Sequence, residues 1–245
     1  MEVDFSRHVA IKALFGSHNY NLNTPSSDRD YKVFLVPNLN DLYDGVEINE
    51  NHVSEEEDYS VHDIRKLTVL FWKSNINFLE IMFSQEHTID PELREIYDRK
   101  EDLARMNLPY LWESCVGMCF QKMKNLNKPT EGTRHLVDQY GYNTKEAIHA
   151  FRVLDFLERY SANKFTNFQE AIWYRDDEQM RDELLGIKSG MYTEAMFRDI
   201  IRDKLTYSSK LKPLFKDKQP DENLKEWLFL TVKDYVCRRI VKEER

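Results

Sequence analysis

The spacing of apolar residues changes along the chain from a two-residue period to a helical period. Residues 30–37 (DYKVFLVP) alternate and are rich in β-branched and aromatic side chains, which predicts a strand. Residues 59–64 predict a second strand or a strand-to-helix junction, and residues 4–15 predict a short helix that turns into a strand. Residues 40–58 are typical of an irregular acidic connection, and the acidic run at 55–58 is typical of a solvated loop.

From residue 65 onward the apolar residues follow a helical period. Residues 65–83 predict a helical segment with a break near Asn75 and Asn77. Asn143 is a candidate N-cap, with Glu146 three residues later in a capping-box-like spacing. Further helices are predicted over residues 109–124, 144–160, 176–186, 193–206 and 222–241.

These elements predict an α+β protein with two parts. We expect a small mixed β-sheet over residues 1–105, followed by a helical domain over residues 106–245. The length of 245 residues allows a substantial core, and only 7 Gly and 7 Pro favour long regular elements.

Charge and cysteine content narrow the functional classes. The net charge of −8 argues against a broad, non-specific coat of nucleic acid, although it permits a local basic patch. No apolar run approaches the ~18 residues of a membrane span, and residues 1–9 lack a signal-peptide pattern. Cys115 and Cys119 lie four apart and are predicted to be small buried side chains, because a zinc site would need two further ligands. We therefore expect a protein of the reducing cytoplasm.

The candidate chemistry begins between residues 16 and 37. Asp28 and Asp30 stand two apart at the mouth of a predicted strand, which places them on one face with Cα atoms roughly 6–7 Å apart. Paired carboxylates repel each other unless a cation lies between them, and oxygen ligands favour a hard cation such as Mg²⁺. The Gly16-Ser17 turn offers backbone N–H groups to phosphate oxygens. The stretch predicts a metal-dependent site that handles nucleotide phosphates.

A second candidate group lies on the predicted helix over residues 144–160. Lys145, His149 and Arg152 follow each other at i, i+4 and i+7, so they share one helix face. They are predicted to form a phosphate-binding wall, with an ordinary solvated face as the alternative. The basic residues between residues 202 and 218 are candidates for contact with a nucleic acid, with an ordinary solvated helix face as the alternative. They are Lys204, Lys210, Lys212 and Lys216.

The motif Phe15-Gly16-Ser17 followed by Asp28 and Asp30 resembles the hG[GS]…D-x-D signature of the DNA polymerase β-like nucleotidyltransferases. The longer stretch GSHNYNLNTPSSDRDYKVFLVP resembles a branch of predicted bacterial and phage nucleotidyltransferases that includes members named for RNA repair. Three later blocks, at residues 63–84, 141–154 and 184–197, resemble that branch in the same order.

The chain departs from the branch at three places. Asn21 stands where the branch often has Gly, Asn143 where it often has Asp, and residues 118–119 where it often has Gly-Tyr. These departures concern the details of substrate binding.

The resemblance implies a polymerase β-like palm, a helical domain that closes the nucleotide cleft, and two Mg²⁺ ions, with Mn²⁺ as a possible substitute. It implies that Asp28 and Asp30 bind metal with a third acid, for which Asp63 is the first candidate and Glu80 the competitor. It also assigns nucleotide binding to five residues: Gly16, Ser17, Lys145, His149 and Arg152.

The implied reaction is Mg²⁺-dependent transfer of a nucleoside monophosphate from an NTP such as ATP, with release of pyrophosphate. Family association makes an RNA or tRNA end the first-choice acceptor. Transfer to a protein or small molecule is the alternative enzyme activity. A non-catalytic nucleotide-binding regulator is the third hypothesis, but such degenerate members usually lose one acid of the D-x-D pair, and both are present here.

Overall fold

The computed structural model describes residues 5–25, 27–53 and 57–243. Its internal contacts divide the chain into two compact units. The first unit contains Met1–Met106 together with Pro220–Arg245, and the second contains Asn107–Gln219. The sequence-based division at residue 105 therefore differs from the observed grouping in one respect, since the last segment of the chain packs with the first unit.

The first unit is built on a mixed five-stranded sheet with the strand order β3-β4-β2-β1-β5. Strand β2 runs parallel to β4, and the other neighbouring pairs are antiparallel. This sheet, with the helices that follow it, confirms the predicted α+β class. The strands are β1 (Val9–Phe15), β2 (Arg29–Leu35), β3 (Asn49–Val53), β4 (Glu57–Asp63) and β5 (His87–Ile89).

Two predictions for this region were wrong. Residues 5–8 do not form a helix, and the irregular connection expected over residues 40–58 contains α1 (Leu39–Tyr43), β3 and the start of β4. Strand β3 has the sequence NENHV and lies at the sheet edge, so it lacks the apolar alternation of a half-buried strand. Of the acidic run at residues 55–58, only Glu57 and Asp58 fall within the described residues, and both belong to β4.

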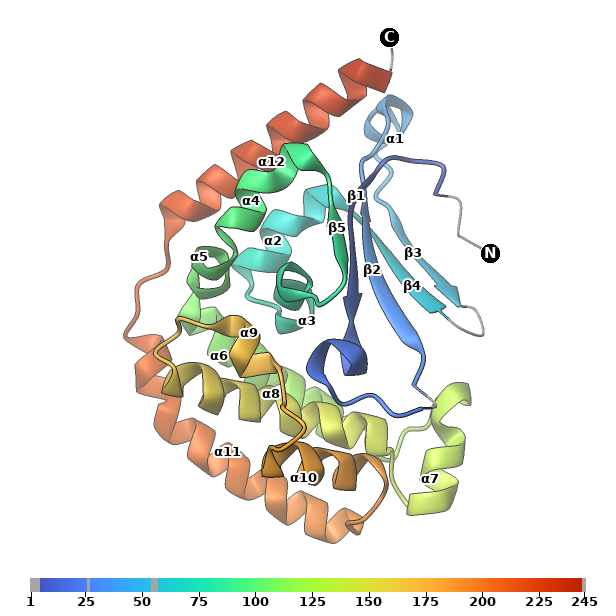
Figure 1. Cartoon of the computed structure of the whole chain (residues 1–245), viewed down its shortest axis with the longest axis vertical. Coiled ribbons are helices and arrows are strands. Elements are labelled where there is room, and N and C mark those ends of the chain that lie inside the picture. The colour runs from blue at the N-terminus through green and yellow to red at the C-terminus, as the bar shows by residue number, and fades with distance from the viewer. Residues whose placement is uncertain (1–4, 26, 54–56, 244–245) are drawn as a thin grey trace. The chain divides into compact units, whose positions relative to one another are not determined.

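Short helices cover one face of the sheet, as Figure 1 shows. Phe78 of α3 packs edge-on against Phe34 of β2 and His62 of β4, which identifies the face that these helices cover. Asn75 caps α3 by accepting a hydrogen bond from the Asn77 backbone N–H, so the predicted break is confirmed. The helical elements of the first unit are η1 (Gly16–Tyr20), α1, η2 (Ile64–Lys66), α2 (Leu67–Trp72), α3 (Ile76–Leu79), η3 (Glu80–Phe83), η4 (Pro91–Leu93), α4 (Arg94–Asp98), α5 (Lys100–Arg105) and α12 (Glu222–Glu243).

The other face of the sheet carries an apolar cluster. It joins two stacked rings, Tyr31 and Tyr59, whose centroids are 5.5 Å apart. The Lys12 ammonium lies over the same pair, 4.6 Å from the Tyr31 centroid. The remaining members of the cluster are Leu14, Val33, Leu35, Ile48 and Val61.

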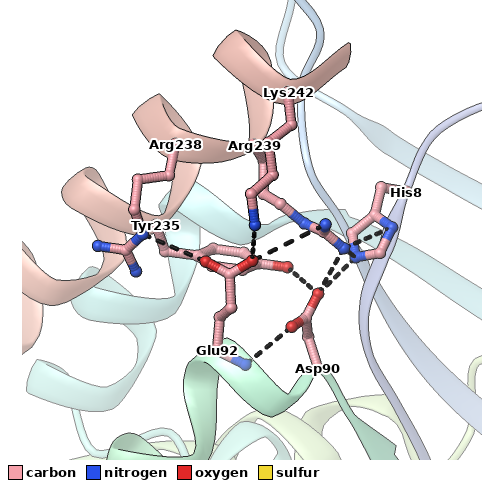
Figure 2. Close-up of polar contacts among 7 residues, drawn as sticks. All are labelled: His8, Asp90, Glu92, Tyr235, Arg238, Arg239 and Lys242. Atoms are coloured by element: carbon pink, nitrogen blue, oxygen red, sulfur yellow. Dashed lines mark hydrogen bonds and ion pairs between the residues drawn. The ribbon is translucent and has the colours of Figure 1, made fainter.

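A polar cluster joins α12 to the rest of the first unit, as Figure 2 shows. The buried carboxylate of Asp90 accepts hydrogen bonds from His8 at 2.6 Å, Tyr235 at 3.0 Å and Arg239 at 2.7 Å. Its other oxygen accepts from the Glu92 backbone N–H at 2.9 Å. Asp90 therefore connects the segments that flank β1 and β5 to the last helix.

The second unit is helical, and α8 lies at its centre. Helices α6, α9, α10 and α11 all pack against α8. Asn143 caps α8 by accepting from the backbone N–H groups of Lys145 and Glu146, which confirms the predicted N-cap. The elements are α6 (Leu108–Asn125), η5 (Glu131–Thr133), α7 (Arg134–Tyr140), α8 (Thr144–Ala162), α9 (Phe168–Ile172), α10 (Gln179–Lys188) and α11 (Glu194–Lys216).

The interior of the second unit contains both apolar and charged side chains. Cys115 and Cys119 are fully buried, as predicted, and burial raises the pKa of each thiol to about 12. The buried carboxylate of Asp155 accepts from Tyr174 at 2.9 Å and from the Lys204 ammonium at 2.8 Å. This charged group links α8 to α11. Across the described ranges of both units, no helix combines the length and apolar character that a membrane crossing requires.

Candidate functional site

Gly16 and Asp30 approach each other closely at one end of the sheet. Strand β1 ends at Phe15, which lies opposite Asp30 on β2. Gly16 then turns the chain with a φ of +74°, and a Cβ built at this position would lie 2.9 Å from the Asp30 Oδ2 atom. Only glycine allows both this φ angle and this contact without strain. The turn and the acid that the sequence motif paired are therefore adjacent in the fold.

The loop that follows Gly16 is held by local hydrogen bonds. Asn21 adopts a left-handed conformation with a φ of 61°, which is a conformation that asparagine tolerates better than most residues. Asn21 can therefore adopt the backbone conformation of the glycine that the similar bacterial and phage nucleotidyltransferases often have at this position. Later in the loop, the Thr24 backbone N–H donates to Ser27 Oγ at 2.9 Å, and the His18 ring lies 3.3 Å from the Ser27 carbonyl oxygen.

Asp28 and Asp30 remain accessible at this end of the sheet. Asp28 is exposed and immediately precedes β2, whereas Asp30 is half-buried within the strand. The loop from Gly16 therefore returns the chain to the sheet beside the point where it left β1.

Asp58 is a third acid at the same level of the sheet. In the parallel pair of β2 and β4, Asp30 lies directly opposite Asp58. Directly opposed residues on neighbouring strands point to the same face, with strands roughly 5 Å apart. Two like charges in this arrangement destabilise a sheet. The pair is therefore a suitable place for a bound cation.

The sequence interpretation missed Asp58 because it assigned the residue to a solvated acidic loop. The available signal was the alternation that continues from residue 58 into Tyr59 and Val61. As a residue of that strand, Asp58 shares a face with Ser60 and His62. The buried apolar residues Tyr59 and Val61 point to the opposite face.

Asp63, the first candidate for the third acid, does not lie beside Asp30 and Asp58. It lies opposite Leu35, five residues beyond Asp58 along β4, which is roughly 16 Å and on the opposite face of the sheet. Its carboxylate is fully buried and accepts from the Arg65 backbone and guanidinium at 2.7–2.9 Å. The structure corrects this assignment, since Asp63 caps η2.

Glu80, the competing candidate, is also fully buried and lies in η3. Its backbone carbonyl accepts from the Asn19 side-chain amide at 3.4 Å. This contact ties η3 to the loop after Gly16, and a metal-binding role for the Glu80 carboxylate stays a prediction.

Directly behind the acids, the same face contains a buried lysine. Lys32 follows Asp30 by two residues on β2 and is 5% exposed. Its ammonium lies 3.1 Å from the centroid of the Phe15 ring and 5.2 Å from that of Phe78. Burial, with the positive charges of Lys32 and Lys66, lowers the pKa of nearby His62 to about 4. His62 is therefore neutral at physiological pH.

The donor set at this end of the sheet is chemically suited to Mg²⁺. Asp28, Asp30 and Asp58 supply hard carboxylate oxygens, which this ion prefers. Within residues 5–25, 27–53 and 57–243, no three His, Cys, Asp or Glu side chains converge closely enough to hold a metal ion. Metal binding would therefore require the carboxylates of these acids to turn toward a common point.

The three predicted phosphate-binding residues on α8 occupy different environments. Lys145 is exposed, His149 is half-buried with its Nε2 3.1 Å from Met118 Sδ, and Arg152 is only 4% exposed. The common face of α8 is confirmed, but the burial of Arg152 favours a role inside the second unit. Nucleotide binding by these residues stays a prediction.

Comparison with known proteins identifies the family. The family model described as the RNA repair pathway DNA polymerase beta family matches residues 4–229, which is most of the chain. No curated protein matches the sequence. The chain therefore belongs to this family and to the polymerase β-like nucleotidyltransferases associated with RNA repair.

Proposed function

We propose that the protein transfers a nucleoside monophosphate from an NTP to the end of an RNA, with Asp28, Asp30 and Asp58 as the metal-binding acids. The observation that carries the proposal is the position of Asp30, which lies against Gly16 on one side and opposite Asp58 on the other. In a member of this family, that arrangement joins the phosphate-binding turn to the acidic residues.

Three residues of the first unit would have distinct roles in the transfer reaction. Gly16 lets the backbone come close to the triphosphate, and Ser17 supplies a hydroxyl and an N–H group to phosphate oxygens. Mg²⁺ bound at the acids would stabilise the charge that develops on the attacking and leaving oxygens. Asp58 is adjacent to Asp30 and is the group best placed to accept the proton of the acceptor hydroxyl.

An RNA acceptor is favoured over a protein or small molecule by the family's association with RNA repair. The test is incubation of the protein with α-³²P-labelled NTPs, Mg²⁺, total cellular RNA and total cellular protein. We expect label on RNA, and we expect the double variant Asp28→Asn/Asp30→Asn to give none while unfolding like the wild type.

Asp44→Asn is a suitable control, because Asp44 follows α1, away from the sheet positions of the acids, and is exposed. It should label RNA at the wild-type rate. Label on protein alone would replace the RNA acceptor with a protein acceptor. Incorporation by the double variant at the wild-type rate would reject the site itself.

A further inference from the structure

Lys32 is a buried positive charge directly behind the acidic residues. Alternate residues of a strand share a face, so Lys32 lies on the side of β2 that carries Asp30, roughly 7 Å away at the Cα atoms. Its ammonium contacts the ring of Phe15, which is the residue opposite Asp30 on β1. The ammonium of Lys32 therefore lies near the strand position of Asp30, on the buried side of the acidic residues.

The surroundings of Lys32 leave little room for it to reach a substrate. With 5% of its surface exposed and its ammonium between Phe15 and Phe78, it lies inside the unit rather than at its surface. The neighbouring positions on the same face are Ala13 of β1 and Ser60 of β4, which carry no charge. A charge enclosed by aromatic rings is poorly screened by water, so its field acts on nearby groups.

The effect of this field is visible at His62, two residues from Ser60 on β4. Burial is the largest cause of the low pKa of His62, and the charge of Lys32 is the next largest. Asp58 lies as far from Lys32 in register as His62 does, since each is two residues from Ser60 on the same face of β4. A positive charge that repels an imidazolium attracts a carboxylate at a similar distance.

We propose that Lys32 is a positioning residue that acts as an internal counter-charge for the metal-binding acids. It stabilises the opposed carboxylates of Asp30 and Asp58 when no metal is bound, and it lowers their affinity for a bare divalent cation. A metal–nucleotide complex carries negative charge of its own, so its binding is favoured by the same lysine. The residue thereby couples metal binding to nucleotide binding.

This inference rests on the proposed metal site, and it is tested by binding rather than by activity alone. The probes are Mn²⁺ alone, followed by electron paramagnetic resonance, and the Mn²⁺–ATP complex, followed by calorimetry. In Lys32→Met we expect affinity for Mn²⁺ alone to rise about tenfold and affinity for Mn²⁺–ATP to fall. Lys32→Arg, which keeps the charge, should behave like the wild type.

Lys12→Met provides a matched control. Lys12 also lies over aromatic rings on the same sheet, but on the opposite face, above Tyr31 and Tyr59. The affinities of the Lys12→Met variant for Mn²⁺ alone and for Mn²⁺–ATP should both equal those of the wild type. If Lys32→Met does not fold, as judged by its thermal transition, Lys32→Gln serves for the same measurement.

The outcomes separate the inference from the function on which it rests. Equal or weaker Mn²⁺ binding by the folded Lys32→Met or Lys32→Gln variant would overturn the inference while leaving the metal site in place. Absence of Mn²⁺ binding in the wild type, with and without ATP, would overturn the proposed function as well. Opposite changes in the two affinities would support the counter-charge, because general structural damage would weaken both.

Discussion

Gly16 lies so close to Asp30 that a single methyl group at position 16 would contact the Asp30 carboxylate at 2.9 Å. The contact joins the end of β1 to the start of β2, and it couples the conformation of the turn to the position of an acid. A change of one residue can thus test whether this geometry matters for the proposed transfer reaction.

Gly16→Ala should abolish most of the nucleotidyl transfer, because the new methyl group displaces the Asp30 carboxylate. The positive φ should also lower the free energy of unfolding by about 1 kcal/mol. Gly45→Ala is the matched control, since Gly45 has a φ of +66° but no atom within 4 Å of the added Cβ. It should show the same loss of stability in urea titrations and full activity. Equal activity of the two variants would show that the contact is not needed.

Asp58→Asn and Asp63→Asn should have opposite consequences. Loss of the Asp58 charge removes a proposed metal ligand and relieves repulsion from Asp30, so activity should fall by at least ~100-fold with unchanged or greater stability. Asp63→Asn weakens the buried pair with Arg65 and should cost about 2 kcal/mol of unfolding free energy, with activity retained. Transfer assays and chemical denaturation of both variants distinguish the two roles. An inactive but stable Asp63→Asn variant would restore Asp63 as the third acid.

The Asp90 cluster predicts a loss of stability at low pH. Burial alone would raise the pKa of Asp90, but hydrogen bonds from Glu92 N, His8 and Tyr235 and the charge of Arg239 outweigh it and lower the pKa. A carboxyl whose pKa is lower in the folded state stabilises the protein above its unfolded pKa of about 4. That contribution disappears as the pH falls through the folded-state pKa.

Asp90→Asn should therefore cost about 3 kcal/mol of unfolding free energy at pH 7. The difference from the wild type should begin to narrow below about pH 4, where the carboxyl of the unfolded chain takes up a proton, and should disappear only below the lower folded-state pKa. Urea titrations between pH 3 and pH 7 measure this difference. A difference that is constant over this range would show that charge is not the source of the contribution.

The buried pair of Asp155 and Lys204 should be the most sensitive polar contact of the second unit. Lys204→Met leaves the Asp155 carboxylate without its 2.8 Å ionic partner and should cost about 3 kcal/mol of unfolding free energy. Lys210→Met, on an exposed position of the same helix, should change stability by less than about 0.5 kcal/mol. Denaturant titration of the two variants tests the comparison, and equal losses would contradict the assignment.

Much of the local structure follows from the sequence alone. The alternation in residues 30–37, the Asn75 break and the Asn143 cap depend on interactions within a few residues, and each appears in the structure. The sequence motif also names Gly16 and the D-x-D pair together, although the pairing of β1 with β2 is what brings Gly16 against Asp30. Helix α11 shows the limit of such reasoning, because it continues to Lys216, ten residues past the predicted end and through Pro213.

Other features were decided only by tertiary structure. Whether Asp58 or Asp63 joins Asp30 depends on the register of β4 against β2, and a shift of an odd number of residues moves a side chain to the opposite face. The return of α12 to the first unit depends on contacts with Asp90 across more than 140 positions of sequence. Local patterns contain no information about either, because register and long-range packing are set by the combined burial of residues that are distant in the chain.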